Sequence, residues 1–244
     1  MNVTGIILAG GSGERLKSVT RDKTTLRIGG GRLINWSVST FTRSEIFSDL
    51  IMVYRDYEQE NMLHEELNSQ VKHSLHKTWV QGGARRQDSV LNALEAVREG
   101  TDYVFIHDGA RPFVTENDLR NLLKAVEKTG AASLARPVTD TIKRAGVAGT
   151  LDNLQLEDLQ RNRLYAMETP QAFRFTDIRE AYRNVQRAGL TVTDCVAAYS
   201  YEPRPVTLVE SEQNNFKITT PADVELANFL ILTGSIKKVF ELGY

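Results

Sequence analysis

A dense run of glycines followed by two basic residues is the first feature of this 244-residue sequence that could do chemistry. Residues 8–16 read Leu-Ala-Gly-Gly-Ser-Gly-Glu-Arg-Leu, and Lys23 follows shortly after. Glycines lack a Cβ, so backbone N–H groups can approach and cradle phosphate oxygens. The loop lacks the Gly-Lys-Ser/Thr ending of a P-loop, and Leu16 replaces the third glycine of a dinucleotide-binding fingerprint. The pattern favours a phosphate loop backed by Arg15 and Lys23 over a glycine turn with solvated charges.

A second candidate site follows the apolar run 103–106, where the chain reads His-Asp-Gly-Ala-Arg-Pro. Asp108, at the carboxyl end of a predicted parallel strand, is well placed to hold a Mg²⁺ that bridges phosphates, because Mg²⁺ prefers hard oxygen ligands. Arg111 could pair with a phosphate in bidentate fashion. Spacing alone equally allows an aspartate that caps a turn and an arginine in a surface ion pair. We expect His107 to be packed rather than catalytic, because no serine or cysteine partner is evident.

Two further loops carry recognition chemistry at predicted helix starts. Residues 81–89 read Gln-Gly-Gly-Ala-Arg-Arg-Gln-Asp-Ser, a glycine-rich approach that suits a base or ribose, with Arg86 beside it. Residues 214–220 place Lys217 just before a helix that has a threonine N-cap and a proline at its first position. A solvated surface lysine is the alternative for Lys217.

The elements that position these loops alternate along the chain. Runs such as 103–106 are apolar on both faces, as in strands covered on both sides. Apolar residues recur at helical spacing over 90–97 and 119–126. Each of these segments is followed by a glycine, Gly100 or Gly130, where we expect the helix to stop. The alternation predicts an α/β fold with a doubly wound, mostly parallel sheet. The predicted strands are residues 3–8, 50–53, 104–106, 133–135 and 206–209.

One segment, residues 137–164, breaks the alternation and has no helical stripe of useful length. An excursion this long inside a compact domain is usually functional or held by another chain. We therefore expect a protruding arm, paired with another subunit, within a single domain that spans residues 1–244.

Composition excludes several classes of protein. The 30 Lys+Arg and 31 Asp+Glu give a net charge of -1, which argues against a nucleic-acid coat or a polybasic membrane binder. A single cysteine, Cys195, excludes a disulfide framework and a zinc site built on paired cysteines. Neither a signal peptide nor an apolar run of roughly 20 residues is present. We expect a cytoplasmic protein without nucleic-acid or membrane partners.

Six motifs in order carry a resemblance to a known family. They are Leu-Ala-Gly-Gly-x-Gly-x-Arg, Gly-Gly-x-x-Arg-x-Asp-Ser-Val, His-Asp-x-Ala-Arg-Pro, Pro-Val-x-Asp-Thr-Ile-Lys-Arg, Thr-Pro-Gln-x-Phe and Asn-x-Lys-Ile-Thr. From about Ile6 to Leu232 the sequence resembles the 2-C-methyl-D-erythritol 4-phosphate cytidylyltransferases of the non-mevalonate isoprenoid pathway. The resemblance implies a Rossmann-like nucleotidyltransferase fold, a homodimer joined through the arm, and transfer of CMP from CTP to methylerythritol phosphate with Mg²⁺.

The resemblance also implies a role for each matching residue. Arg15 and Lys23 match residues that stabilise the transition state on the CTP α-phosphate, whereas Arg161 and Lys217 match residues that position methylerythritol phosphate. Asp108 would meet Mg²⁺ and the substrate. Arg161 lies on the arm with Thr141, so both would reach into the partner's site. The implied CTP contacts are Ala9, Gly10, Gly11, Gly13, Gly83, Arg86, Ser89 and Ala110, and the other implied substrate contacts are Arg111, Thr141, Thr169 and Thr193.

The residue types suit this reaction. A phosphate monoester is already an anion near neutral pH, since its second pKa is near 6, so its attack on the α-phosphorus needs no general base. Catalysis should rest on cations, Mg²⁺ and positioning. The sequence departs from the family at Asp22 and Thr24 around Lys23, at Ala84 where an acidic residue is common, and at Cys195 where glutamate is usual. These departures bear on substrate identity and rate.

Two alternatives remain open at this point. A ribitol-5-phosphate cytidylyltransferase would use the same reaction type, although Asp140 to Arg144 together with Arg161 looks more like the methylerythritol enzyme. A nucleotide-binding module without turnover is the other alternative, and the presence of both Arg15 and Lys23 speaks against it.

Overall fold

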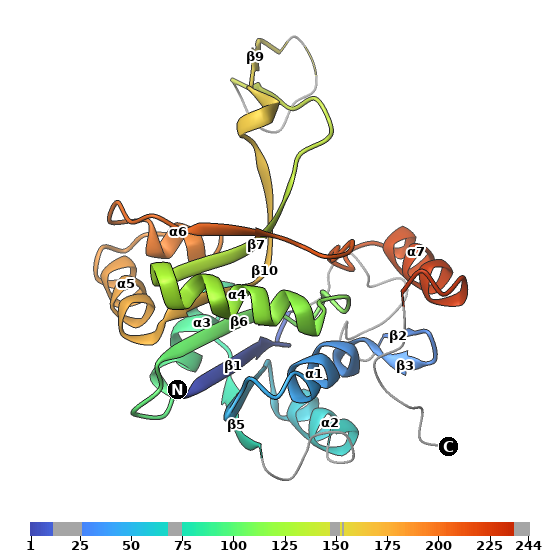
Figure 1. The fold of residues 1–244 in the computed structure, drawn as a ribbon, viewed down its shortest axis with the longest axis vertical. Coiled ribbons are helices and arrows are strands. Elements are labelled where there is room, and N and C mark those ends of the chain that lie inside the picture. Colours follow the sequence, from blue (N-terminus) through green and yellow to red (C-terminus); the bar gives the residue numbers. More distant parts are fainter. Residues whose placement is uncertain (12–25, 68–74, 147–151, 153, 237–244) are drawn as a thin grey trace.

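A seven-stranded sheet forms the centre of the molecule, with strands in the order β11-β7-β10-β6-β1-β4-β5 (Figure 1). The computed structural model describes residues 1–11, 26–67, 75–146, 152 and 154–236. All neighbouring strands pair in parallel except β10, which runs antiparallel to β6 and β7. The predicted mostly parallel sheet is therefore confirmed. Its strands are β1 (Val3–Leu8), β4 (Asp49–Tyr54), β5 (His76–Gln81), β6 (Tyr103–Asp108), β7 (Ala131–Pro137), β10 (Tyr165–Arg174) and β11 (Thr207–Glu210).

Helices cover both faces of this sheet, as a doubly wound fold requires. Successive residues of a strand point to opposite faces, so Phe105 belongs to one core cluster while its neighbours Val104 and Ile106 belong to the other. The first cluster is completed by α1 (Leu33–Arg43), α2 (Tyr57–Leu67) and α4 (Glu116–Thr129), and the second by α3 (Arg86–Glu95), α5 (Phe175–Arg187) and α6 (Cys195–Tyr199).

One of the two predicted helix stops is confirmed and the other is wrong. Helix α4 ends at Gly130, which adopts the left-handed φ of 81° that favours glycine. Helix α3 instead ends at Glu95, before Gly100 is reached. The N–H groups of Ala96 and Val97 donate to carbonyls three residues back, which tightens the last turn and ends the helix. Val97 still packs into the core from outside the helix.

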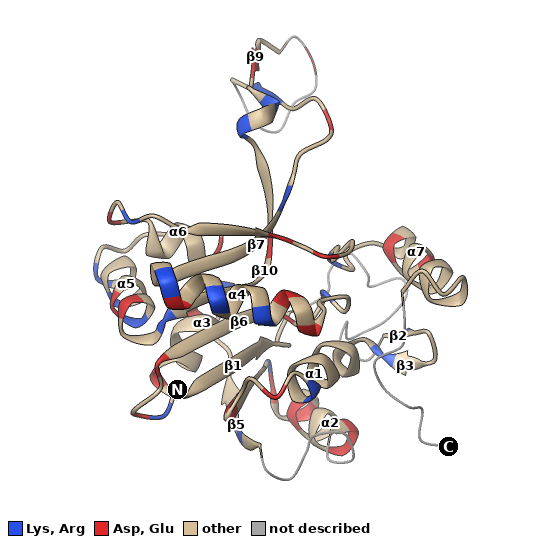
Figure 2. Cartoon of the chain, viewed as in Figure 1, with Lys and Arg blue, Asp and Glu red and all other residues tan. Residues whose placement is uncertain are grey.

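The excursion at 137–164 projects from the body as an arm (Figure 1). It contains the antiparallel pair β8 (Lys143–Ala145) and β9 (Leu156–Asp158), followed by the short 3-10 helix η3 (Arg161–Arg163). In Figure 2 part of the ribbon of η3 is blue, the colour of Lys and Arg, because this turn carries Arg161 and Arg163. The protruding arm is confirmed, and its pairing with another subunit stays a prediction.

A third, smaller core cluster anchors the segment before the last helix. Helix α7 (Pro221–Leu232) packs near the hairpin β2 (Arg27–Ile28) and β3 (Gly31–Arg32) through Trp36, Phe113 and Ile218. Thr220 caps α7 with its side chain, as its sequence predicts. Over the described ranges, no helix is both long enough and apolar enough to cross a membrane.

Candidate active site

The loops that follow β1 and β6 lie side by side at the carboxyl ends of these parallel strands. Leu8 and Asp108 are register partners, and the N–H of Gly109 donates to the Leu8 carbonyl at 3.0 Å. On the other side of β1, the N–H of Ala9 donates to the Val53 carbonyl at 2.8 Å. The two loops predicted to carry chemistry therefore meet at the edge where open α/β sheets bind ligands.

Asp108 is the centre of an ion-pair cluster, with a side chain that is only 11% exposed. Arg86 donates through Nε and Nη2 to Oδ1 at 3.0 and 2.9 Å, and Lys217 Nζ donates to Oδ2 at 2.7 Å. Burial alone would raise the pKa of the Asp108 carboxyl, but the two cations outweigh burial and hold this pKa well below its usual range. Three residues from three separate predicted loops thus form one cluster in which positive charge is in excess.

The first glycine-rich loop is described as far as Gly11. A Cβ on Gly10 would lie 3.3 Å from the backbone nitrogen of Arg55, so the absence of a side chain lets the loop run close to the end of β4. Gly11 is exposed, and a Cβ there would meet no atom within 4 Å. Ala9 is buried. Gly13, Arg15 and Lys23, which the sequence also assigns to this loop, lie outside the described residues.

The second glycine-rich loop is closed by a serine hydroxyl. Ser89 Oγ accepts the N–H of Gly83 at 3.0 Å and donates to the Arg85 carbonyl at 3.1 Å. A Cβ on Gly83 would lie 2.4 Å from the Cβ of Asp88, so only glycine fits beside the first turn of α3. This packing fixes the turn of α3 that carries the arginine of the ion-pair cluster.

Arg111 lies in the same loop as the aspartate and is held by backbone carbonyls. Its Nη1 donates to the Asn215 carbonyl at 2.8 Å and its Nη2 to the Met167 carbonyl at 3.3 Å. The alternative of a surface ion pair is therefore wrong for this arginine. Burial lowers the pKa of the Arg111 guanidinium. The Ala110 carbonyl accepts the N–H of Ile218 at 2.9 Å, which ties this loop to the segment before α7.

His107 is fully buried, which confirms the prediction that it is packed. Burial lowers the pKa of its ring to about 4. Nδ1 lies 3.1 Å from the hydroxyl of Thr169, and Nε2 lies 3.0 Å from the Arg111 carbonyl. Thr169 is itself only 4% exposed, and its contact with substrate stays a prediction.

The remaining predicted contacts lie on two other segments. Thr193 is exposed in the loop before α6, next to the helix N-cap Asp194. Thr141 and Arg161 are exposed on the projecting arm, where Arg161 Nη1 donates to the Thr139 carbonyl at 3.0 Å. The sheet edge thus brings Arg86, Arg111, Thr169 and Lys217 close to Asp108, whereas Thr141 and Arg161 stand on the arm.

Two buried glutamines that sequence reasoning did not single out hold the segment before α6. Gln87 donates to the Leu190 carbonyl at 3.0 Å and accepts the N–H of Val192 at 2.9 Å. Gln171 donates to Asp194 Oδ2 at 2.9 Å and accepts the first N–H of α6 at 3.0 Å. Gln171 belongs to the Thr-Pro-Gln-x-Phe motif, but no spacing in the sequence indicates the hydrogen-bond partners of either glutamine.

Cys195 is buried behind the arginine of the ion-pair cluster. Tyr182 donates its hydroxyl to Sγ at 3.3 Å, and Arg86 Nη1 lies 3.7 Å from the same sulfur. Burial raises the pKa of the Cys195 thiol. The neutral thiol leaves Asp108 as the anionic partner of Arg86.

The surroundings of Asp108 fit a metal ion that arrives with a phosphate ligand. Among the residues the structure describes, no three His, Cys, Asp or Glu side chains cluster in a way that could hold an ion. Mg²⁺ is commonly bound by one or two carboxylates together with substrate phosphates and waters. The buried Asp108 carboxylate can be the protein ligand of such a site once one of its two cationic partners has moved from the carboxylate to a phosphate group.

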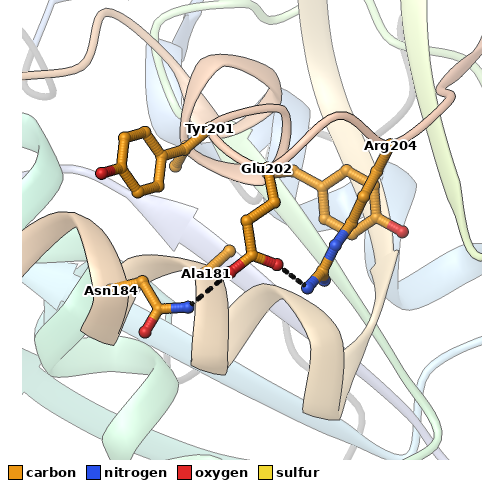
Figure 3. A pocket seen from close by; sticks show the side chains of 7 residues that line it. Ala181, Asn184, Tyr201, Glu202 and Arg204 are labelled. Atoms are coloured by element: carbon orange, nitrogen blue, oxygen red, sulfur yellow. Dashed lines mark hydrogen bonds and ion pairs between the residues drawn. The ribbon is translucent and has the colours of Figure 1, made fainter.

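A shallow surface depression lies away from this edge, between α5, α6 and the segment that follows α6 (Figure 3). Glu202 in its wall accepts a hydrogen bond from Asn184 at 3.1 Å and pairs with Arg204 at 2.5 Å. These polar groups satisfy one another, so the depression is part of the packing around α6.

Comparison with known proteins gives a consistent result over nearly the whole chain. The model of the IspD family, 2-C-methyl-D-erythritol 4-phosphate cytidylyltransferase, matches residues 3–233. The cytidylyltransferase of that name from Clostridium acetobutylicum is 34% identical over 95% of this chain and 98% of its own length. The one from Bacillus cereus is 36% identical over 92% and 95%.

A solved structure agrees in fold. The 4-diphosphocytidyl-2C-methyl-D-erythritol synthase from Anaerococcus prevotii DSM 20548 superposes with a TM-score of 0.82 at 26% identity, covering 95% of this chain and 98% of that one. The match of the family model and the curated relatives lead to one conclusion. The chain belongs to the 2-C-methyl-D-erythritol 4-phosphate cytidylyltransferase family.

Proposed function

We propose that this protein transfers CMP from CTP to 2-C-methyl-D-erythritol 4-phosphate, giving 4-diphosphocytidyl-2-C-methyl-D-erythritol and pyrophosphate. The observation that carries the proposal is the convergence of Arg86 and Lys217 on Asp108 beside the glycine-rich loop. Such a cluster can bind phosphate groups through its cations and a phosphate-bound metal ion through its carboxylate. The relatives' names supply the nucleotide and the acceptor.

The bond changes are those of an in-line substitution. An oxygen of the acceptor phosphate forms a bond to the α-phosphorus of CTP as the bond to pyrophosphate breaks, and the electron pair leaves with pyrophosphate. The attacking phosphate is already an anion, so no side chain has to remove a proton. The protein must instead bring two polyanions together and stabilise charge on the α-phosphate oxygens. We assign that stabilisation to Arg15 of the glycine-rich sequence and to Lys23, which follows it shortly after.

Lys217 and Asp108 share the positioning of the reactants. Lys217 is the partner of Asp108 that is more exposed, with 38% of its side chain accessible, so it is free to exchange the carboxylate for the acceptor phosphate. Asp108 would hold Mg²⁺, which when bound with CTP neutralises phosphate charge. Arg111, Thr169 and Thr193 complete the acceptor side. The CTP side is assigned to Ala9, Gly10, Gly11, Gly13, Gly83, Arg86, Ser89 and Ala110.

The projecting arm is the basis of our proposal for the quaternary structure. Thr141 and Arg161 stand on a projection whose exposed apolar side chains include Ile142 and Leu156, and the exposed Tyr165 follows directly after it. Exposed apolar groups on a projecting hairpin favour contact with another chain. The proposed enzyme is a cytoplasmic homodimer of single-domain subunits, in which each arm supplies Thr141 and Arg161 to the partner's site.

The experiment that tests this function is a pyrophosphate-release assay with CTP, Mg²⁺ and a panel of acceptor phosphates. We expect turnover with 2-C-methyl-D-erythritol 4-phosphate. Turnover with ribitol 5-phosphate but not with the methylerythritol acceptor would select the ribitol enzyme instead. Binding of CTP without pyrophosphate release in the presence of any acceptor would show a nucleotide-binding module and overturn the proposal.

A further inference from the structure

A buried chain of hydrogen bonds runs through His107 and connects the two ends of the loop that carries the candidate metal ligand. The backbone N–H of Asp108 donates to Thr169 Oγ1 at 3.0 Å. The same hydroxyl lies 3.1 Å from Nδ1 of His107, and Nε2 of that ring lies 3.0 Å from the Arg111 carbonyl. Ser37 Oγ lies 3.2 Å from Nε2 and donates to the same carbonyl at 3.2 Å.

The groups at the two ends of the chain fix the direction of every bond in it. A carbonyl oxygen only accepts, so Nε2 must carry the hydrogen that faces Arg111. A backbone N–H only donates, so the hydroxyl of Thr169 accepts from Asp108 and is left with its own hydrogen to give to Nδ1. A buried ring is neutral and carries one hydrogen, which agrees with a free acceptor at Nδ1. This series of hydrogen bonds therefore selects the Nε2–H tautomer of His107.

The same threonine is also a backbone link to the segment before α7. Asn215 Nδ2 donates to the Thr169 carbonyl at 2.8 Å, while the Asn215 carbonyl accepts from Nη1 of Arg111. Three segments that are distant in sequence, around 107–111, 167–169 and 215, are thereby joined by hydrogen bonds that are buried or partly buried. A change in one link moves the aspartate and the arginine together.

We propose that His107 is a positioning residue, which acts through the hydroxyl of Thr169 to hold Asp108 and Arg111 in the geometry that the transfer reaction needs. The inference rests on the proposed function and deepens it. It gives Thr169 a task different from the substrate contact that family resemblance implies. The one hydrogen of its hydroxyl is committed to Nδ1 of His107 inside the fold, so the hydroxyl cannot donate to the acceptor while it serves the aspartate loop.

The kinetic test uses Thr169→Val, His107→Phe and the double variant, with Thr169→Ser as the conservative rescue. Loss of a residue that orients a ligand residue typically costs about 10 to 100-fold in activity. We expect each single variant to lower kcat by that factor with a smaller change in KM. The kcat of the double variant should be no lower than that of the less active single variant. Thr169→Ser keeps the hydroxyl and should recover most of kcat.

Thr42→Val is the matched control, because Thr42 is also buried but donates to a carbonyl within α1. We expect its kcat to stay at the wild-type value. A rise in KM for the acceptor in Thr169→Val, with normal turnover in His107→Phe, would show direct substrate contact and overturn the proposal. Wild-type protein without pyrophosphate release would contradict the proposed function instead, so the two failures are distinguishable.

A second readout requires no turnover. Nitrogen-15 NMR of the wild-type protein in chelator should show a hydrogen on Nε2 and none on Nδ1 of His107. Thr169→Val removes the donor to Nδ1 and should shift that resonance. A hydrogen on Nδ1, or rapid averaging between the tautomers, would overturn the proposed direction of the hydrogen bonds through His107.

Discussion

Lys217 Nζ lies 2.7 Å from Oδ2 of Asp108, although 109 positions separate the two residues in the sequence. The contact exists because the segment before α7 crosses the carboxyl end of β6, where the Ala110 carbonyl accepts the N–H of Ile218. Arg86 pairs with the other carboxylate oxygen, Oδ1. The carboxylate thus keeps two cations in place before any phosphate arrives, which preorganises the site for a polyanionic ligand.

Replacing this carboxylate should damage both activity and stability. In Asp108→Asn, Arg86 and Lys217 lose their shared anion, and we expect turnover to fall by on the order of 100 to 1,000-fold, by analogy with other preorganised charge contacts. The free energy of unfolding should fall by about 2 kcal/mol, less than for a fully buried pair, because both cations keep some contact with water. Pyrophosphate release and urea unfolding measure the two effects.

Asp158→Asn provides the comparison in solvent. Asp158 pairs with Lys143 on the arm and is 86% exposed, so its loss should change the free energy of unfolding by less than about 1 kcal/mol. Equal stability losses in the two variants would mean that the carboxylate at the sheet edge is not the buried link between its cations.

The thiol of Cys195 should resist modification in the folded protein. It is fully buried beneath Tyr182, and burial raises its pKa, which lowers the fraction of reactive thiolate. If exposure needs local opening that costs about 3 kcal/mol, the reaction slows by about 100-fold. Because the chain has one cysteine, the absorbance released by a disulfide reagent reports this site alone, with urea-unfolded protein as the reference. Equal rates in the two states would contradict the buried position.

The pKa of His107 predicts a loss of stability in mild acid. The folded ring has a pKa of about 4 against an ordinary value of 6.5, so between these pH values the unfolded chain binds a proton that the folded chain does not. The contribution of His107 to stability is therefore fully present above pH 6.5 and is lost as pH falls towards 4, by about 3 kcal/mol in all. Urea unfolding in chelator from pH 4.5 to 7.5 measures the slope.

His107→Phe isolates this effect, because phenylalanine fills the same space and does not titrate. The variant should show a shallower slope than the wild type over the same interval. Identical slopes would mean that other groups cause the acid sensitivity.

The sequence predicted five of the seven strands of the central sheet and missed the edge strand β5 and the inner strand β10. Strands β1, β4 and β6 are short apolar runs and were all predicted. Strand β10 was missed because its buried positions include Glu168, which accepts a hydrogen bond from Ser211, and Gln171, which donates to Asp194. A strand whose buried side chains are polar shows no apolar pattern, so periodicity cannot find it.

In the candidate site, likewise, the sequence predicted individual residues but not the contacts between them. Sequence motifs identified Arg86, Asp108 and Lys217 as separate candidates, because each stands beside a loop with recognisable chemistry. Their convergence depends on the strand order, which local patterns do not specify. The hydrogen bonds of His107 and Thr169 arise only when β6 and β10 pair, so no spacing in the sequence indicates them.

The arm yields a prediction that depends on two subunits. Arg161 is exposed on η3 of the arm, whereas Lys23 follows the glycine-rich sequence 8–16 and lies outside the described residues. If each arm serves the partner's site, Arg161→Ala and Lys23→Ala damage complementary parts of a shared site. Each protein alone should have little activity. A mixed dimer regains one intact site, made from the Lys23 of one chain and the Arg161 of the other.

Random exchange makes half of the dimers mixed, so the mixture should recover about a quarter of wild-type activity if homodimers exchange freely. Arg163→Ala is the matched control, because it removes a neighbouring arginine of η3 that has no proposed contact with substrate, and it should keep normal activity. Mass spectrometry of differently labelled chains establishes that exchange has occurred. Activity that stays at the level of the two parents after proven exchange would mean that each arm acts on its own subunit, because only a site shared between chains can be rebuilt by mixing.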